Sequence, residues 1–391
     1  MKYTNKYLLT ILAIGAVSFL VFIVWGRGSA SLDAYADGLV EKCRNVAQKQ
    51  ECYDREIPKL MKKISMEDTF GVTTLVQERD TSFLYCHVLG HTLASIETKK
   101  DPGAWKDVIS RCPSGVCSNG CVHGAFQERY RSEVLSGEEL EETKKELEVI
   151  CEEREGYIPT DVEQGSCYHA LGHLFMYITG ADINMAVSIC DETSKKTDGR
   201  DFSALCYDGA FMQIFQPLGA DDISLIRGKE QTKESVPSFC ANFSGEKMAS
   251  CWSESWPLFL EEITLPGGAL NFCSHLSGEN KEDCLTDIFY IIPIQAGFNQ
   301  SLIKEYCGAL PGTYKDKCFA QFVIRLLEID SRNVEMAVTF CGGLDEERKM
   351  KCFETLADVS KFVFHRESSE YEKLCGLIPA ELKSRCYEKE D

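Results

Sequence analysis

Five pairs of cysteines repeat at a nearly constant interval in the C-terminal part of the chain. In each pair, ten residues separate the two cysteines, and the first members of successive pairs advance by 33, 34, 34 and 34 residues. A fixed period in this range is typical of two-helix repeats, in which each unit buries its apolar face against its neighbours. The pattern predicts one disulfide bond in each repeat. The pairs are Cys240/Cys251, Cys273/Cys284, Cys307/Cys318, Cys341/Cys352 and Cys375/Cys386.

Eight of the other ten cysteines extend this pattern towards the N-terminus with more variable spacing. Cys86 and Cys117 then remain, and we expect them to pair with each other. Connectivity is not proved by sequence, and a Cys₄ zinc site of Cys86, Cys112, Cys117 and Cys121 stays an alternative, although C-x-x-C spacing is absent. Ten disulfide bonds would require an oxidising compartment. The four further pairs are Cys43/Cys52, Cys112/Cys121, Cys151/Cys167 and Cys190/Cys206.

A mostly apolar run over residues 7–25 follows two lysines near the N-terminus. Its length approaches the roughly 20 residues that a transmembrane helix needs. Positive charge before such a span keeps the N-terminus in the cytoplasm. We therefore predict a cytoplasmic segment at 1–6, a signal anchor at 7–25 and a linker at 26–35. The bulk of the chain would then be extracytoplasmic, in a periplasm or at a cell surface. A cleaved signal peptide is the alternative.

The segments between cysteine pairs have the pattern of helices. Between Cys318 and Cys341, apolar residues recur at helical spacing, and Asp330 and Ser331 are suited to cap a second helix. We expect irregular repeats over residues 36–239 and regular repeats over 240–391. The apolar residues of this first helix are Phe319, Phe322, Val323, Leu326 and Leu327.

The segment from Cys167 to Cys190 contains a Leu-Gly pair at 171–172, Phe175 three residues later, and Gly180-Ala181 at a turn position. It resembles a Sel1-like repeat, a tetratricopeptide-related unit with an LG-x-x-Y signature. The Helicobacter cysteine-rich proteins of this family also carry two cysteines in each repeat. The resemblance implies a right-handed α-solenoid used for binding. We therefore predict an all-α fold, a right-handed α-solenoid of disulfide-stapled helical hairpins with one N-terminal transmembrane helix.

Five of the seven histidines lie in two copies of one module, H-x-x-G-H followed by C-x-[HD]-G-A-F. Histidines at i and i+4 lie on one helical face, and both His and Asp ligate divalent metals. The modules therefore predict two metal triads, for zinc, iron or manganese, which could also merge into one site. An open fourth position would resemble a catalytic zinc or non-haem iron site. The triads are His87, His91, His123 and His169, His173, Asp208.

A structural interpretation of the same modules stays open. Their glycines would allow two helices to approach closely, and the histidines would then form hydrogen bonds between helices. The remaining two histidines, His275 and His365, are expected at the surface. The glycines are Gly90, Gly124, Gly172 and Gly209.

Composition and missing motifs exclude several function classes. A net charge of −19 disfavours nucleic acid and anionic membrane surfaces as partners. Walker A, G-x-G-x-x-G and G-x-S-x-G motifs are absent, as is C-x-x-C-H, so nucleotide, hydrolase-elbow and covalent haem sites have no support. Aromatic and acidic residues close together in the sequence could also line a sugar-binding cleft. A helix with an aromatic face and exposed acidic residues explains them equally well. These are Trp252, Glu254, Trp256, Glu261 and Glu262.

Two hypotheses of function follow from the sequence. The first is a membrane-anchored scaffold whose concave face binds a protein, a peptide or an envelope component. The second is a metal-binding protein or a metal-dependent enzyme that uses the histidine modules. No catalytic residue is identified, and whether the protein is an enzyme is left open.

Overall fold

The computed structural model describes residues 32–130, 133–155, 157–196, 198–217 and 220–387, and the chain divides into two compact units, Met1–Leu84 and Tyr85–Asp391. Within the described residues, regular structure is helical, with isolated β-bridges and no strand. The all-α prediction is confirmed. The predicted signal anchor at 7–25 lies outside the described residues. Among the helices that are described, none combines the length and the apolar character needed to cross a membrane.

The first unit is a small helical bundle. Tyr53 and Phe83 are fully buried, and their ring centroids lie 4.7 Å apart. Asp80 follows the last helix and accepts hydrogen bonds from the Tyr53 hydroxyl at 2.8 Å and from Lys49 Nζ at 2.9 Å. These bonds connect the end of the unit to its second helix. The helical segments are residues 32–43, α2 (Lys49–Glu56), η1 (Ile57–Lys62) and α3 (Met66–Arg79).

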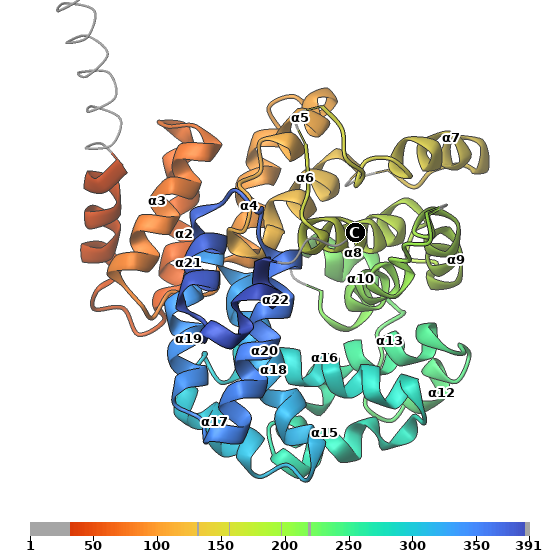
Figure 1. The fold of residues 1–391 in the computed structure, drawn as a ribbon. Coiled ribbons are helices and arrows are strands. Elements are labelled where there is room, and N and C mark those ends of the chain that lie inside the picture. The colour runs from red at the N-terminus through yellow and green to blue at the C-terminus, as the bar shows by residue number, and fades with distance from the viewer. Residues whose placement is uncertain (1–31, 131–132, 156, 197, 218–219, 388–391) are drawn as a thin grey trace, which may run out of the picture. The chain divides into compact units, whose positions relative to one another are not determined.

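The second unit is a succession of helical hairpins in two layers, in which each inner helix packs on the next inner helix (Figure 1). The inner helices are α4 (His87–Thr98), α6 (Gly120–Tyr130), α8 (Asp161–Ile178), α10 (Ser203–Phe215), α13 (Glu246–Glu254), α16 (Glu279–Gln295), α18 (Thr313–Ile329), α20 (Glu346–Val363) and α22 (Lys383–Tyr387). The outer helices are α5 (Trp105–Ser110), α7 (Gly137–Leu147), α9 (Ile183–Thr193), α12 (Val236–Cys240), α15 (Pro266–Phe272), α17 (Gln300–Gly308), α19 (Val334–Gly342) and α21 (Ser369–Leu377). The change from irregular to regular cysteine spacing at 239/240 lies inside this unit.

Ten disulfide bonds link the hairpins, and every predicted pair is confirmed. No cysteine is free, so the alternative Cys₄ zinc site is wrong. In the regular repeats each bond joins the end of an outer helix to the beginning of the next inner helix, as Cys307 of α17 and Cys318 of α18 show. A protein with ten disulfide bonds is typical of an oxidising, extracytoplasmic compartment.

The hairpin from α18 to α19 follows the predicted pattern. The apolar face of α18 is buried from Phe319 to Leu327. Asp330 does act as a cap, but its carboxylate accepts from the backbone N–H of Arg332 at the start of a single 3₁₀ turn. The helix α19 begins only after that turn, at Val334.

The succession of hairpins in the second unit returns on itself. Val116 forms an isolated antiparallel bridge with Asp330, and the Ser331 N–H donates to the Gly115 carbonyl at 3.2 Å. The helix α20 packs against α8, where His365 Nε2 lies 3.4 Å from Glu163 Oε2. Early and late repeats of this unit therefore contact each other directly.

We expect the Cys307–Cys318 bond to stabilise the second unit by constraining its unfolded chain. It closes a loop of about 12 residues, for which chain-entropy models give about 3 kcal/mol. The double substitution Cys307→Ala/Cys318→Ala should therefore lower the free energy of unfolding by about that amount in a urea titration. A loss below about 1 kcal/mol would contradict this expectation.

Candidate metal centre

The structure brings five histidines from three successive inner helices into one cluster, which we call the histidine centre. His123 of α6 lies in the middle: its ring centroid is 4.9 and 4.8 Å from those of His87 and His91 on α4. The centroids of His169 and His173 on α8 lie 5.4 and 5.5 Å from it on the other side. The two sequence modules thus meet in one place, as the merged alternative anticipated.

Contacts between helix backbones at the module glycines make this cluster possible. A Cβ atom on Gly124 would lie 2.7 Å from the carbonyl carbon of His91, and one on Gly209 would lie 2.9 Å from that of His169. A Cβ on Gly172 would lie 2.7 Å from the backbone nitrogen of Ala210. Real side chains do not fit at such distances, so only glycine permits these crossings. The packing role of the glycines is confirmed, and it coexists with the histidine cluster.

The histidine pair on α4 is held in one orientation by oxygen acceptors. His87 Nδ1 lies 3.1 Å from the Ser118 carbonyl oxygen, and His91 Nδ1 lies 3.3 Å from Gln127 Oε1. An oxygen acceptor at Nδ1 places the ring proton there. Each ring therefore donates from Nδ1 and keeps an unprotonated Nε2, which is how metal-ligating histidines are usually oriented.

The pair on α8 repeats the arrangement. His173 Nδ1 lies 2.9 Å from Gln213 Oε1, and His169 hydrogen-bonds to the backbone at Leu205. Sequence reasoning missed both glutamines, although each follows the C-x-[HD]-G-A-F motif within the same helix. Gln127 follows its motif directly and Gln213 follows its motif two residues later, so the duplication gave no common position that could have identified them.

Within each pair, the two Nε2 atoms face each other at short distance. The Nε2–Nε2 distance is 3.0 Å between His87 and His91 and 3.2 Å between His169 and His173. In the tautomer with both Nδ1 atoms protonated, the two Nε2 lone pairs repel at that distance unless a proton or a metal ion lies between them. Two nitrogens bound to one ion at about 2.1 Å with an angle of 90–110° would be about 3.0–3.4 Å apart. The observed distances match that geometry.

The triad of His87, His91 and His123 is the tightest group of candidate ligands. One ligand atom from each residue lies within 4.8 Å of the other two, and no other such group of three occurs among the described residues. His123 is 3% exposed, and its buried Nδ1 has no hydrogen-bond partner in the described part of the chain. The first predicted triad is therefore assembled, with one ring nitrogen left unsatisfied.

Burial keeps the histidine centre neutral. It lowers the pKa of His87 to about 4, with a further contribution from the Arg325 charge. It also lowers the pKa of the other four histidines, and neighbouring histidine rings add to the effect for His91, His123 and His169. Neutral imidazole is the form that binds metal ions, so the cluster is ready to bind them at neutral pH.

A buried arginine from the late repeats borders the histidine centre. Arg325 of α18 is 7% exposed, hydrogen-bonds to Tyr85 and lies over the ring of Tyr290, 3.9 Å from its centroid. Glu328 Oε2 is 3.8 Å from Arg325 Nη1, and burial raises the Glu328 pKa to about 7 although the arginine charge opposes the shift. No local motif marks Arg325, because the return of the late repeats is what brings it near.

The second predicted triad is not assembled. Asp208 of α10 faces the following repeats, where its carboxylate hydrogen-bonds to Ser250 and lies in the field of Glu254 and Asp287. Burial is the largest cause of a raised pKa in all three carboxyl groups, and the value for Asp208 is about 7. His169 and His173 therefore face His123 instead of Asp208.

The alternative sugar cleft gains no support from the structure. Trp252 is 4% exposed and packs among Phe259, Phe272 and the ring of His275, which it stacks on at 4.5 Å. An aromatic face in contact with the core explains this segment. His275 is exposed as expected, and His365 is partly exposed beside Glu163.

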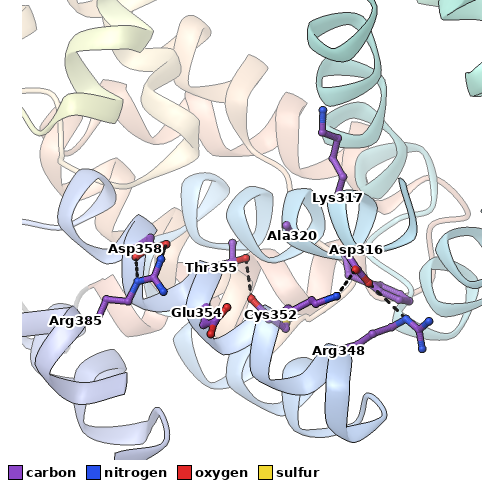
Figure 2. A pocket seen from close by; sticks show the side chains of 11 residues that line it. Asp316, Lys317, Ala320, Arg348, Cys352, Glu354, Thr355, Asp358 and Arg385 are labelled. Carbon is purple, nitrogen blue, oxygen red and sulfur yellow. Dashed lines mark hydrogen bonds and ion pairs between the residues drawn. The ribbon is translucent and has the colours of Figure 1, made fainter. Parts of the chain in front are cut away.

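A charged pocket of about 270 Å³ lies elsewhere in the second unit, between α18, α20 and α22 (Figure 2). Its cations are paired with carboxylates: Lys351 Nζ lies 2.8 Å from Asp316 Oδ2, and Arg385 forms two hydrogen bonds with Asp358. These ion pairs connect successive repeats. The pocket shares no lining residue with the histidine centre.

No protein-family model matches this chain, and no curated protein or solved structure is significantly similar to it. The helical hairpins and their ten disulfide bonds agree in architecture with cysteine-rich helical repeats. Membership of the Sel1-like family is not confirmed.

We expect Gly124→Ala to destabilise the second unit, because the new methyl group would collide with the backbone of α4. Overpacking of this kind typically costs 1–3 kcal/mol, and backbone atoms cannot move aside as a side chain can. A loss of about 3 kcal/mol or more should appear in urea unfolding. Gly376→Ala in α21 is the control, since nothing lies within 4 Å of its Cβ position; it should be neutral or stabilising. Equal effects of both changes would contradict the model of a close crossing.

The raised pKa of Asp208 predicts a pH-dependent stability. Because the folded-state pKa is about 7 and the ordinary value is 3.8, the folded state holds a proton that the unfolded state releases. Stability is therefore lost as pH rises from about 4 through 7. Asp208→Asn removes this loss, so we expect the variant to be more stable than the wild type by about 1–3 kcal/mol at pH 8, after discounting for partial exposure. The two should be similar at pH 3.5, and a difference independent of pH would contradict the prediction.

Proposed function

We propose that this protein binds a divalent transition-metal ion through His87, His91 and His123. The observation that carries the proposal is the pair of facing Nε2 atoms on α4, 3.0 Å apart, with both Nδ1 atoms engaged by oxygen acceptors. This arrangement leaves two lone pairs directed at one point. In the tautomer that satisfies both oxygen acceptors, the two lone pairs repel unless a proton or a metal ion lies between them, and with a metal ion they form a ligand pair.

The donor set narrows the choice of ion. All candidate donors in the triad are imidazole nitrogens, which suit zinc, copper, nickel and iron better than they suit manganese, an ion that prefers oxygen. Three protein ligands would leave at least one coordination position open, as in catalytic zinc sites. Arg325 supplies a buried positive charge beside the centre, which favours an anionic ligand in such a position.

The setting of the metal centre is part of the same proposal. The repeats would form a right-handed solenoid held in an oxidising compartment, and residues 7–25 would anchor it with the bulk of the chain outside. A scaffold that binds a protein, a peptide or an envelope component is the second candidate function. The observation that favours it is the pocket between α18 and α20, which is lined by paired charges of both signs. Charged groups of a partner could form ion pairs with these side chains in place of the pairs within the pocket.

We expect one tightly bound ion in this triad at neutral pH. Full-length protein with its disulfide bonds intact is stripped with a chelator, dialysed against zinc, copper, iron(II) or manganese, and measured by elemental analysis. His87→Ala/His91→Ala should lose the ion of this triad. Because an ion that binds only the folded state stabilises it, wild type should gain about 2.7 kcal/mol at a free metal concentration 100 times Kd.

The chain provides its own control for this test. His275→Ala/His365→Ala removes the same number of imidazoles outside the histidine centre and should retain the wild-type metal content. If wild-type protein takes up no zinc, copper or iron, or if both double variants lose metal equally, the metal function is overturned and the scaffold function remains.

A further inference from the structure

We propose that the histidine centre holds two metal ions, one at His87 and His91 and a second at His169 and His173, with the ring of His123 as a ligand shared between them. This inference rests on the proposed metal function and extends it from one ion to two.

The two outer pairs are built alike. Each consists of histidines at i and i+4 on one helix, with Nε2–Nε2 distances of 3.0 and 3.2 Å. In each pair a glutamine oxygen accepts at Nδ1 of the second histidine, Gln127 for one pair and Gln213 for the other. Whatever makes the α4 pair suitable for an ion therefore applies equally to the α8 pair.

His123 has the position and the free atom that a shared ligand needs. Its ring centroid lies 4.8–4.9 Å from the rings of the α4 pair and 5.4–5.5 Å from those of the α8 pair. The side chain is 3% exposed, yet Nδ1 has no hydrogen-bond partner in the described part of the chain. Leaving a buried polar atom unpaired is costly, so its occurrence at this position points to a missing partner.

A ring that binds two ions uses both nitrogens. Neutral imidazole carries one N–H proton. When the second ion binds, this N–H bond breaks, the proton passes to solvent, and a bond forms between that nitrogen and the ion. Each ion would then have three nitrogen ligands and open positions for water or an anion. Copper(II) and zinc(II) are the ions expected to occupy such nitrogen-only positions most tightly.

The geometry also predicts the order of binding. The ligand atoms of the α4 pair and His123 already lie within 4.8 Å of one another, whereas the α8 pair is farther from His123. The first ion should therefore bind to the triad, and the second should bind more weakly. A metal titration should resolve two steps.

The test is a titration of chelator-stripped full-length protein with zinc alone and with copper(II) alone, followed by elemental analysis. We expect two ions per chain in the wild type and in His275→Ala/His365→Ala, and one in His169→Ala/His173→Ala. With copper, a shared imidazole couples the two spins. The electron paramagnetic resonance signal per copper should then be weaker in the wild type than in the His169→Ala/His173→Ala variant.

Two single substitutions test the same point without removing a ligand. Gln213→Ala should weaken the second step and Gln127→Ala the first, each by 10–100-fold, as loss of a hydrogen-bond partner to a ligating histidine typically does. This pair is informative even where the double histidine variant does not fold.

The outcomes separate the two proposals. No bound ion in the wild type overturns both. One ion in the wild type overturns the two-ion centre and leaves the metal function standing. Two ions that persist in His169→Ala/His173→Ala, or glutamine substitutions that affect both steps equally, overturn the assignment of the second ion to the α8 pair.

Discussion

The direct contact of helix backbones at the module glycines is the constraint on which the histidine centre depends. Where α4 crosses α6 and α8 crosses α10, the absence of a side chain at Gly124 and Gly209 lets one helix lie against a carbonyl group of the other. The carbonyl groups concerned belong to His91 and His169, so the crossing and the ligand positions are set by the same residues. A methyl group at either glycine would separate the helices and the imidazoles together.

The histidine centre makes an unfavourable contribution to the free energy of folding. Five imidazoles must be buried in neutral form, and their lowered pKa values express that cost. In the following repeats, burial also holds the pKa values of Asp208, Glu254 and Asp287 above their ordinary values. A repeat protein is stabilised by interactions within each repeat and between neighbouring repeats. One disulfide bond in most hairpins adds a further local contribution to stability, without requiring a single large core. Covalent links of this kind can offset the unfavourable burial of polar groups.

The sequence was most informative for features that depend only on the spacing of residues along the chain. Spacing predicted nine of the ten disulfide bonds, because a link between the end of one helix and the start of the next needs only a short loop. The tenth, Cys86–Cys117, has a sequence separation of 31 and was predicted because these two cysteines remained. Helical spacing likewise predicted His87 and His91 on one face, and duplication predicted that His123 would join them. Asp208 does not join His169 and His173, because equivalent positions in duplicated motifs need not face the same neighbour. Its helix is followed by an ordinary repeat, whereas that of His123 is followed by a second histidine module.

The amino-acid sequence by itself therefore determined the helical hairpins, most of their disulfide bonds and the types of metal ligand available, since these depend on residues close in sequence. Only the tertiary structure decided which ligands meet. The packing of α8 against α6 placed His169 and His173 beside His123, and the return of the late repeats brought Arg325 to the same place. Such contacts depend on the angle at which each hairpin packs on the next. That angle is set by side-chain volumes summed over many repeats, and no short motif records it.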